Sequence, residues 1–114
     1  MRLHPFRALR PAPELAERVA AVPYDVVNRA EAAALAAGNP YSFLHVGRSD
    51  IDLPEEVDPY DPRVYAKARD ALDRFQAEGT LIRESAPSLY LYRQIMDGRA
   101  QTGVVGCVHI DDYD

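Results

Sequence analysis

Two alternating segments around Asp97-Gly98 constrain the fold more than any other feature of this sequence. SLYLYRQIM, residues 88–96, alternates between two faces, and QTGVVGCVHI, residues 101–110, returns with a similar pattern. Alternation of this kind is typical of a β-strand, and Asp-Gly favours the tight turn that joins two antiparallel strands. The sequence therefore predicts a β-hairpin within residues 88–110.

Three helices are predicted, at residues 13–22, 29–37 and 62–78. Pro13 and Pro62 stand in first turns, where the missing N–H of proline has no partner to lose. Asn28 can cap the second helix, and Glu31 stands where it completes a capping box. Gly38 then offers a left-handed residue that ends this helix.

The remaining segments predict two further strands and a loop. FRALR, residues 6–10, and SFLHV, residues 42–46, are expected to be strands. GRSDIDLPEEVDPYDP, residues 47–62, is acidic and proline-rich and is expected to be a loop. Together these elements indicate the fold class α/β (α+β), a single domain over residues 1–114 with a mixed sheet and a C-terminal hairpin.

Composition and charge exclude several classes of function. Hydrophobic residues make up 47% of the chain, which indicates a folded globule, and a net charge of -5 argues against nucleic-acid binding. A helix followed by a hairpin also occurs in winged-helix DNA-binding proteins, but Asp70, Asp73 and Glu78 would cancel the attraction to phosphate. Cys107 is the only cysteine, so no internal disulfide can form. Because no apolar segment could form a signal peptide or cross a bilayer, we expect a cytoplasmic protein without a membrane partner.

The histidines and the cysteine do not indicate a metal site. His4, His45 and His109 lack the spacing of paired metal ligands, so no metal site is predicted. His45 lies in the predicted strand at residues 42–46, where it could be structural or functional. Cys107 has apolar neighbours and is expected to be buried.

Pro23-Tyr24-Asp25 lies between the first two predicted helices, in a loop of the kind that often displays functional groups. Asp25 can accept hydrogen bonds from an amine or hydroxyl of a ligand, and the Tyr24 hydroxyl can lie beside it. In this interpretation Tyr24, Asp25 and His45 bind a small molecule in a cleft. The alternative is an ordinary Asx turn with Tyr24 packed in the core.

Four segments cover essentially the whole chain in order: HPFRALRPAPELAERVAAVPYDVV, NPYSFLHVGR, DLPEEVDPYDPRVYAKARDALDRFQAEGTL and SLYLYRQIMDGRAQTGVVGCVHIDDYD. Together they resemble the start of a bacterial and archaeal family catalogued as domain of unknown function 1015. Members of that family are longer and continue into a Lys-His-Glu segment and an Asp-Gly-His-His-Arg motif. The resemblance implies that these residues are the N-terminal part of a longer protein.

The resemblance also implies a function. The Asp-Gly-His-His-Arg motif is similar to one in ParB/sulfiredoxin-like proteins, some of which are free-serine kinases, and family members are often encoded beside serine-biosynthesis enzymes. This implies phosphoryl transfer to or from serine or phosphoserine in the full-length parent, with ATP or ADP and magnesium, and a fragment that is inactive alone. No catalytic residue is assigned.

If phosphate binds to this chain, the basic donors on its predicted strands are Arg7, Arg10 and Arg93. The alternative function is a non-catalytic ligand-binding, regulatory or assembly module. The last strand is also expected to have an open edge or a swapped partner, so homo-oligomers could form through the sheet.

Overall fold

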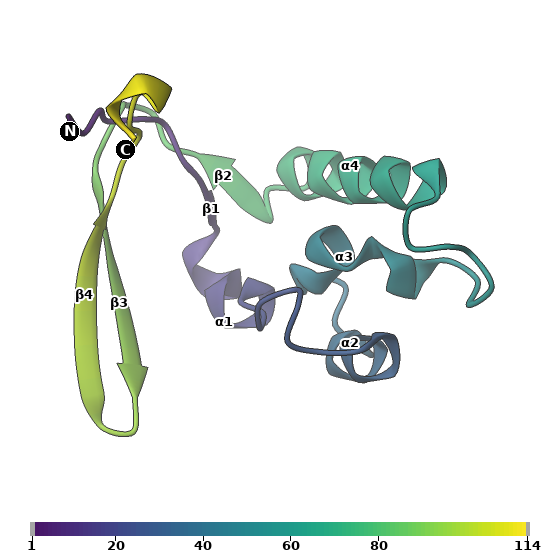
Figure 1. Cartoon of the computed structure of the whole chain (residues 1–114). Coiled ribbons are helices and arrows are strands. Elements are labelled where there is room, and N and C mark those ends of the chain that lie inside the picture. Colours follow the sequence, from purple (N-terminus) through teal and green to yellow (C-terminus); the bar gives the residue numbers. More distant parts are fainter. Residues whose placement is uncertain (1, 114) are drawn as a thin grey trace. The chain divides into compact units, whose positions relative to one another are not determined.

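The computed structural model describes residues 2–113, which divide into two compact units. Pro11–Ile82 is called the helical unit here, because it contains every α-helix of the described residues. Met1–Arg10 together with Arg83–Asp114 is called the hairpin unit. Figure 1 shows the elements of both units along the chain.

The helical unit contains two short 3-10 helices and four α-helices. They are η1 at Pro13–Leu15, α1 at Ala16–Val19, α2 at Arg29–Ala36, α3 at Leu44–Gly47, η2 at Ser49–Asp52 and α4 at Pro62–Ala77. The helices predicted at residues 29–37 and 62–78 are confirmed. None of the helices within residues 2–113 combines the length and apolar character needed to cross a membrane.

The first helix is shorter than the predicted 13–22, because α1 ends at Val19. Ala20 adopts an extended backbone with ψ 133°, which cannot continue a helix. The carbonyl of Val19 then accepts a hydrogen bond from the Phe43 N–H at 2.9 Å. Phe43, which is distant in sequence, therefore provides the hydrogen-bond donor for the last carbonyl of this helix, and the helix ends before Pro23.

Side-chain caps fix the starts of α2 and α4, and the cap of α2 is the one that the sequence predicts. Asn28 Oδ1 accepts from the Glu31 N–H at 2.8 Å, and Glu31 Oε1 accepts from the Asn28 N–H at 3.0 Å, so the capping box is complete. At the start of α4, Asp61 Oδ1 accepts from the Arg63 N–H at 2.8 Å. Gly38 has φ 70°, the left-handed conformation expected after α2.

The strand predicted at residues 42–46 is wrong, because this segment forms the short helix α3. Ser42 Oγ accepts a hydrogen bond from the Leu44 N–H at 3.2 Å, and Leu44 is buried whereas Phe43 is exposed. A five-residue apolar run fits a buried strand or a helical turn equally well, and tertiary packing decides between them. His45 therefore lies on a helix. The predicted loop that follows contains the 3-10 helix η2.

The core of the helical unit is small and includes Phe75 of α4, which is only 1% exposed. Leu44 of α3 is also buried, and α2 contributes Ala32 and Ala36. Alanines on a buried helix face allow its backbone to approach its neighbours closely. On the same face of α4 as the buried Phe75, Val64, Ala68 and Leu72 are half-buried.

The strands form two separate two-stranded sheets. Their members are β1 at Leu9–Pro11 with β2 at Leu81–Arg83, and β3 at Tyr90–Met96 with β4 at Arg99–Val105. The predicted hairpin and the α+β class are confirmed. The strands form two pairs and not one mixed sheet, and the segment at residues 42–46 contributes no strand to either pair. At the turn, φ is 51° for Asp97 and 77° for Gly98, as a type I′ turn requires.

The base of the hairpin is closed by the N-terminal segment. Phe6 forms a bridge with Ser88 and His4 a bridge with Cys107, so only the last residues of the strand predicted at residues 6–10 belong to β1. The Tyr90 hydroxyl donates to the Phe6 carbonyl at 2.8 Å, and the two rings meet edge to face. Cys107 is exposed, contrary to the prediction, because its pairing with His4 is made by backbone groups and leaves its side chain accessible.

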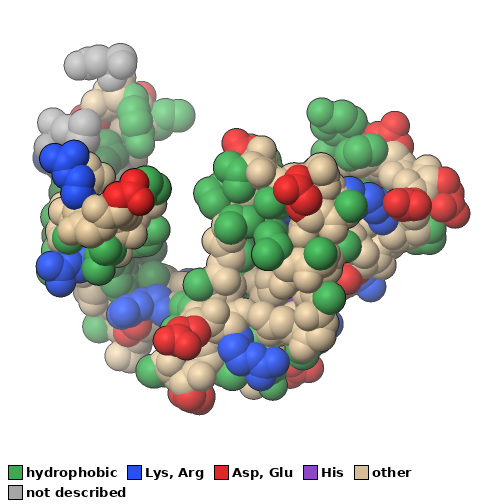
Figure 2. Space-filling view, turned by 90° about the horizontal axis from the view of Figure 1, so that it is seen from below, with side chains coloured by type: hydrophobic (Ala, Val, Ile, Leu, Met, Phe, Trp, Pro, Cys, Tyr) green, Lys and Arg blue, Asp and Glu red, His purple; other side chains and the backbone are tan. Residues whose placement is uncertain are grey.

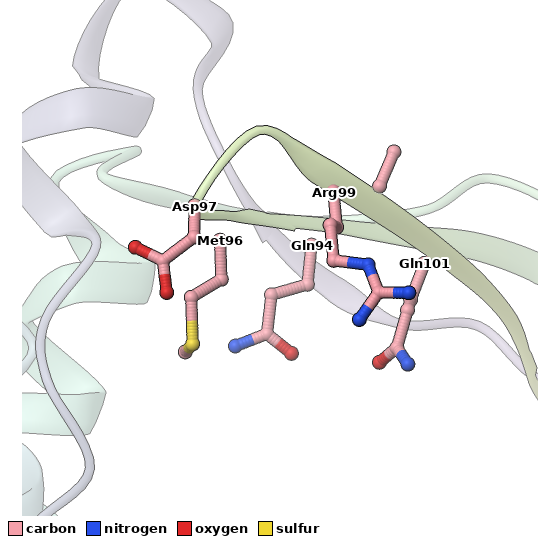
Figure 3. A pocket seen from close by; sticks show the side chains of 6 residues that line it. Gln94, Met96, Asp97, Arg99 and Gln101 are labelled. Atoms are coloured by element: carbon pink, nitrogen blue, oxygen red, sulfur yellow. The ribbon is translucent and has the colours of Figure 1, made fainter.

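Side chains on the hairpin alternate between two faces. One face carries the side chains that Figure 3 shows around a shallow hollow of about 490 Å³, namely Gln94, Met96, Arg99 and Gln101. The opposite face carries Leu91, Ile95 and Val104. Every residue of both strands except Tyr90 is exposed. Figure 2 shows hydrophobic side chains, in green, at the surface of the molecule.

Candidate functional site

Tyr24 and Asp25 are the two central residues of a tight turn between α1 and α2. The Val26 N–H lies 3.3 Å from the Pro23 carbonyl, which closes a four-residue turn. The Tyr24 residue is 65% exposed, so its ring does not pack in the core, and Asp25 is exposed as well. The turn therefore displays both side chains to solvent.

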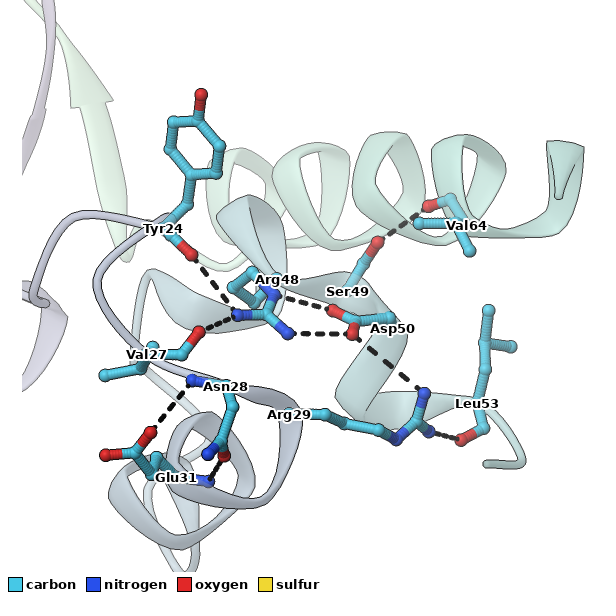
Figure 4. A network of polar contacts seen from close by, with 10 residues as sticks. All are labelled: Tyr24, Val27, Asn28, Arg29, Glu31, Arg48, Ser49, Asp50, Leu53 and Val64. Atoms are coloured by element: carbon cyan, nitrogen blue, oxygen red, sulfur yellow. Dashed lines mark hydrogen bonds and ion pairs between the residues drawn. The ribbon is translucent and has the colours of Figure 1, made fainter. Parts of the chain in front are cut away.

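Arg48 holds the backbone of this turn, as Figure 4 shows. Its Nη1 donates to the carbonyl of Tyr24 at 3.2 Å and to that of Val27 at 2.6 Å. Its Nε and Nη2 donate to the two carboxylate oxygens of Asp50, each at 3.0 Å. A planar guanidinium bound on both sides has little freedom to rotate, so the turn is fixed in one position.

Asp50 is the buried anion of this network. It is 8% exposed, and Arg29 Nη1 lies 3.9 Å from its carboxylate while Arg29 also donates to the Leu53 carbonyl. The hydrogen bonds from Arg48 lower the pKa of Asp50 below its ordinary value and outweigh the opposing effect of burial. The same hydrogen bonds raise the pKa of Arg48. The pair is therefore ionised at neutral pH.

An open apolar hollow of about 390 Å³ lies beside the turn. Val22, Pro23 and Tyr24 line one part of it, and Phe43 and Leu44 line another. Val22 is 42% and Phe43 39% exposed, which leaves a substantial part of each side chain accessible. Apolar surface held in a concave shape is the commonest property of small-molecule sites.

Two residues that line the hollow have unpaired backbone amides. Ala20, Ala21 and Val22 line it and belong to no helix or strand. Within residues 2–113, the backbone N–H groups of Ala21 and Val22 have no hydrogen-bond partner. These two amides therefore remain free to donate to an acceptor.

His45 is held away from this hollow by its own hydrogen bonds. Its Nδ1 lies 2.7 Å from Asp52 Oδ2, and its Nε2 lies 3.0 Å from the Asn39 carbonyl oxygen. Tyr24 lines the hollow, but neither Asp25 nor His45 does. With both ring nitrogens occupied, His45 ties α3 to the segments on either side of it.

Over residues 3–114 the sequence matches the family described as "Protein of unknown function (DUF1015)". The chain belongs to the DUF1015 family. The resemblance found in the sequence is thereby confirmed. No curated protein and no solved structure matches the chain.

In this DUF1015 chain, the arginines predicted to bind phosphate lie in the hairpin unit. Arg7 Nε donates to the Glu84 carbonyl at 2.7 Å, and Arg10 forms an ion pair with the Glu84 carboxylate at 3.2 Å. The Arg10 guanidinium also lies 5.5 Å from the centre of the Tyr90 ring. Arg7 and Arg10 therefore come together around Glu84, whereas Arg93 is exposed on β3.

Within residues 2–113 no group of three or more His, Cys, Asp or Glu residues could hold a metal ion.

Sequence reasoning missed the most important parts of this DUF1015 site, Arg48, Asp50 and Phe43. Arg48 and Asp50 belong to the segment predicted to be a loop, and the carbonyls bound by Arg48 lie 21 and 24 residues away in sequence. Phe43 belongs to the segment predicted to be a strand. An arginine two residues before an aspartate is the only signal in the sequence, and it is too common to indicate a site.

Proposed function

We propose that this DUF1015 chain is a cytoplasmic, non-catalytic ligand-binding module. Its ligand would be a small molecule with an aromatic or branched apolar group and a hydrogen-bond acceptor. The supporting observation is the hollow beside Tyr24: its volume of about 390 Å³ lies in the range of small-molecule sites. Val22, Tyr24 and Phe43 would contact the apolar group, and the Ala21 and Val22 amides would bind the acceptor.

The network around Arg48 supports binding because it fixes the Tyr24 turn before any ligand arrives. A side chain and loop that are already ordered lose little entropy on binding. An aromatic contact adds about 1 kcal/mol beyond the area that it buries, so Tyr24 would contribute to affinity without dominating it. We therefore expect weak, saturable binding of simple ligands.

Titration with phenylacetate, followed by amide NMR, tests this proposal, since the molecule combines a ring with a carboxylate. Saturable shifts are expected at Ala21, Val22 and Phe43. Tyr24→Ser should weaken binding about threefold to tenfold through loss of the aromatic contact. Tyr60→Ser is the matched control, because Tyr60 is 82% exposed and lies outside the lining of the hollow. Absence of saturable shifts, or equal effects of the two substitutions, would reject the hollow as a site.

A second candidate is that the parent protein transfers phosphate to or from serine, with ATP or ADP and magnesium. Its support is the pair of arginines at Glu84: Arg7 Nε donates to the Glu84 carbonyl at 2.7 Å, and Arg10 forms an ion pair with the Glu84 carboxylate at 3.2 Å. Arg7 and Arg10 carry two positive charges and Glu84 one negative charge, so this group has a net positive charge that would attract a phosphate. Thermal-shift measurements of the full-length parent protein with serine, phosphoserine, ADP and ATP, each with magnesium, test this candidate. Stabilisation by phosphoserine or ATP that Arg10→Ala abolishes would favour this candidate. No stabilisation by any of the four ligands would reject it in favour of the binding module.

A further inference from the structure

Within residues 2–113, both faces of the β3–β4 hairpin are exposed beyond Tyr90 at its base. Leu91 is 79% and Ile95 69% exposed on one face, and Met96 is 64% exposed on the other. A two-stranded hairpin is only marginally stable in water, and three or more strands with an apolar face are usually needed. The hairpin is therefore a structure that gains stability from an additional strand.

The register of the hairpin identifies which backbone groups point outward. Met96 and Arg99 flank a two-residue turn and form a hydrogen-bonded pair, and such pairs alternate along an antiparallel ladder. The outward-pointing residues of β4 are therefore Ala100, Thr102 and Val104. Those of β3 are Leu91, Arg93 and Ile95. Within residues 2–113, none of these backbone groups has a hydrogen-bond partner outside the hairpin.

The two edges differ in the residue at their centre. If an edge pairs with its own copy through all of its outward residues, a two-fold axis places the central residue opposite itself. On β3 this residue is Arg93, and like charges directly opposite each other are destabilising. On β4 it is Thr102, and Thr–Thr pairs across strands are favourable. Neither strand carries the proline or lysine that often protects an edge, so the central residue decides between the two edges.

We propose that two copies of this chain associate through their β4 strands, antiparallel and centred on Thr102, to form a four-stranded sheet. Ala100 of each copy lies opposite Val104 of the other, and about six main-chain hydrogen bonds form. The two Arg93 side chains stand on the outer strands, three strand spacings or about 14 Å apart. This exceeds the screening length of about 8 Å at physiological ionic strength, so their repulsion is small.

The same geometry predicts how strong the association is. Pairing along one seven-residue edge buries much less than the roughly 800 Å² per partner of stable complexes. The dimer is therefore weak and depends on protein concentration. Its gain is two rows of apolar side chains, formed by Leu91, Ile95 and Val104 of both copies, on either side of the central row of Arg93 and Thr102.

Amide hydrogen exchange at low and high protein concentration tests the register. Protection is expected to rise with concentration at Ala100, Thr102 and Val104 and to stay constant at Arg93 and Ile95. Protection of the β3 amides instead would overturn the choice of edge. A monomer at all concentrations up to the solubility limit would overturn the dimer.

A charge placed on the two-fold axis provides a second test, measured by sedimentation equilibrium. Thr102→Lys puts two like charges opposite each other and is expected to weaken the dimer about fivefold at low salt, with recovery at high salt. Gln94→Lys is the matched control, because it adds the same charge on β3, away from the axis. Concentration-independent protection of the Gln101 and Gly103 amides verifies that each variant keeps its hairpin. Equal weakening by both substitutions would show an effect of net charge and reject the proposed register.

Discussion

Asp50→Asn should destabilise the helical unit strongly, because it removes the negative charge that two arginines share. Loss of one partner of a buried ion pair costs about 3–5 kcal/mol. The side chains of Arg48 and Asp50 are still 17% and 12% exposed, so some of the cost is relieved by water. We therefore expect the free energy of unfolding to fall by about 3 kcal/mol at neutral pH, a large fraction of the stability of a small unit.

The same substitution should change how stability depends on pH. The pKa of Asp50 lies below its ordinary value of 3.8, so its contribution to stability is fully present above that pH. As the pH falls below 3.8 towards the folded-state pKa, the carboxylate takes up a proton and the contribution is lost. The difference in unfolding free energy between the wild type and Asp50→Asn should therefore be constant above about pH 5 and shrink in acid.

Urea unfolding followed by far-UV circular dichroism measures this difference, since the signal comes mainly from the α-helices of the helical unit. Asp70→Asn is the control, because the Arg69–Asp70 pair is 72% and 68% exposed and should contribute at most about 0.5 kcal/mol. A loss below about 1 kcal/mol for Asp50→Asn, or a difference that does not shrink in acid, would refute the argument.

Two further predictions concern the hairpin base and the start of α4. Gly106→Ala should destabilise the hairpin by about 1 kcal/mol, because the added methyl group would lie 2.8 Å from Leu89 Cδ2. Gly103→Ala has open space and should be neutral, and hydrogen exchange of the hairpin amides compares the two. Asp61 should titrate at about 2, mainly because of the hydrogen bond from the Arg63 side chain. Carbon-detected NMR of its carboxyl group should show this midpoint move towards 3.8 in Arg63→Gln, and an unchanged midpoint would contradict the assignment.

The parts of the fold that could be predicted are those set by local chemistry. The capping box of Asn28 and Glu31, the first-turn Pro62 and the Asp97-Gly98 turn each act within a few residues, so the sequence alone reveals them. The predicted strand at residues 42–46 failed because a short apolar run has no period long enough to distinguish a strand from a helix.

The candidate site could be predicted only in part, for a related reason. Tyr24 was identifiable because Pro23 interrupts the preceding helical pattern and marks a loop. Arg48 was not, since its role depends on carbonyls more than 20 residues away that only the folded chain brings to it. Asp25 and His45 each follow directly after a residue that lines the hollow, but neither lines it. The hydrogen bonds of His45 to Asp52 and Asn39 hold its ring outside the hollow.

The discontinuous hairpin unit has a consequence for how the chain is made. The bridges of His4 and Phe6 require Cys107 and Ser88, which the ribosome adds roughly 80 to 100 residues later. At a synthesis rate of about 5–20 residues per second, the partners of the N-terminal segment are added roughly 5–20 s after it. By then Pro11–Ile82 has been synthesised and can fold. During that interval the apolar side chains of Leu3 and Phe6 are available to other nascent chains. Co-translational aggregation, and protection by chaperones, should therefore depend on this segment more than on the helices.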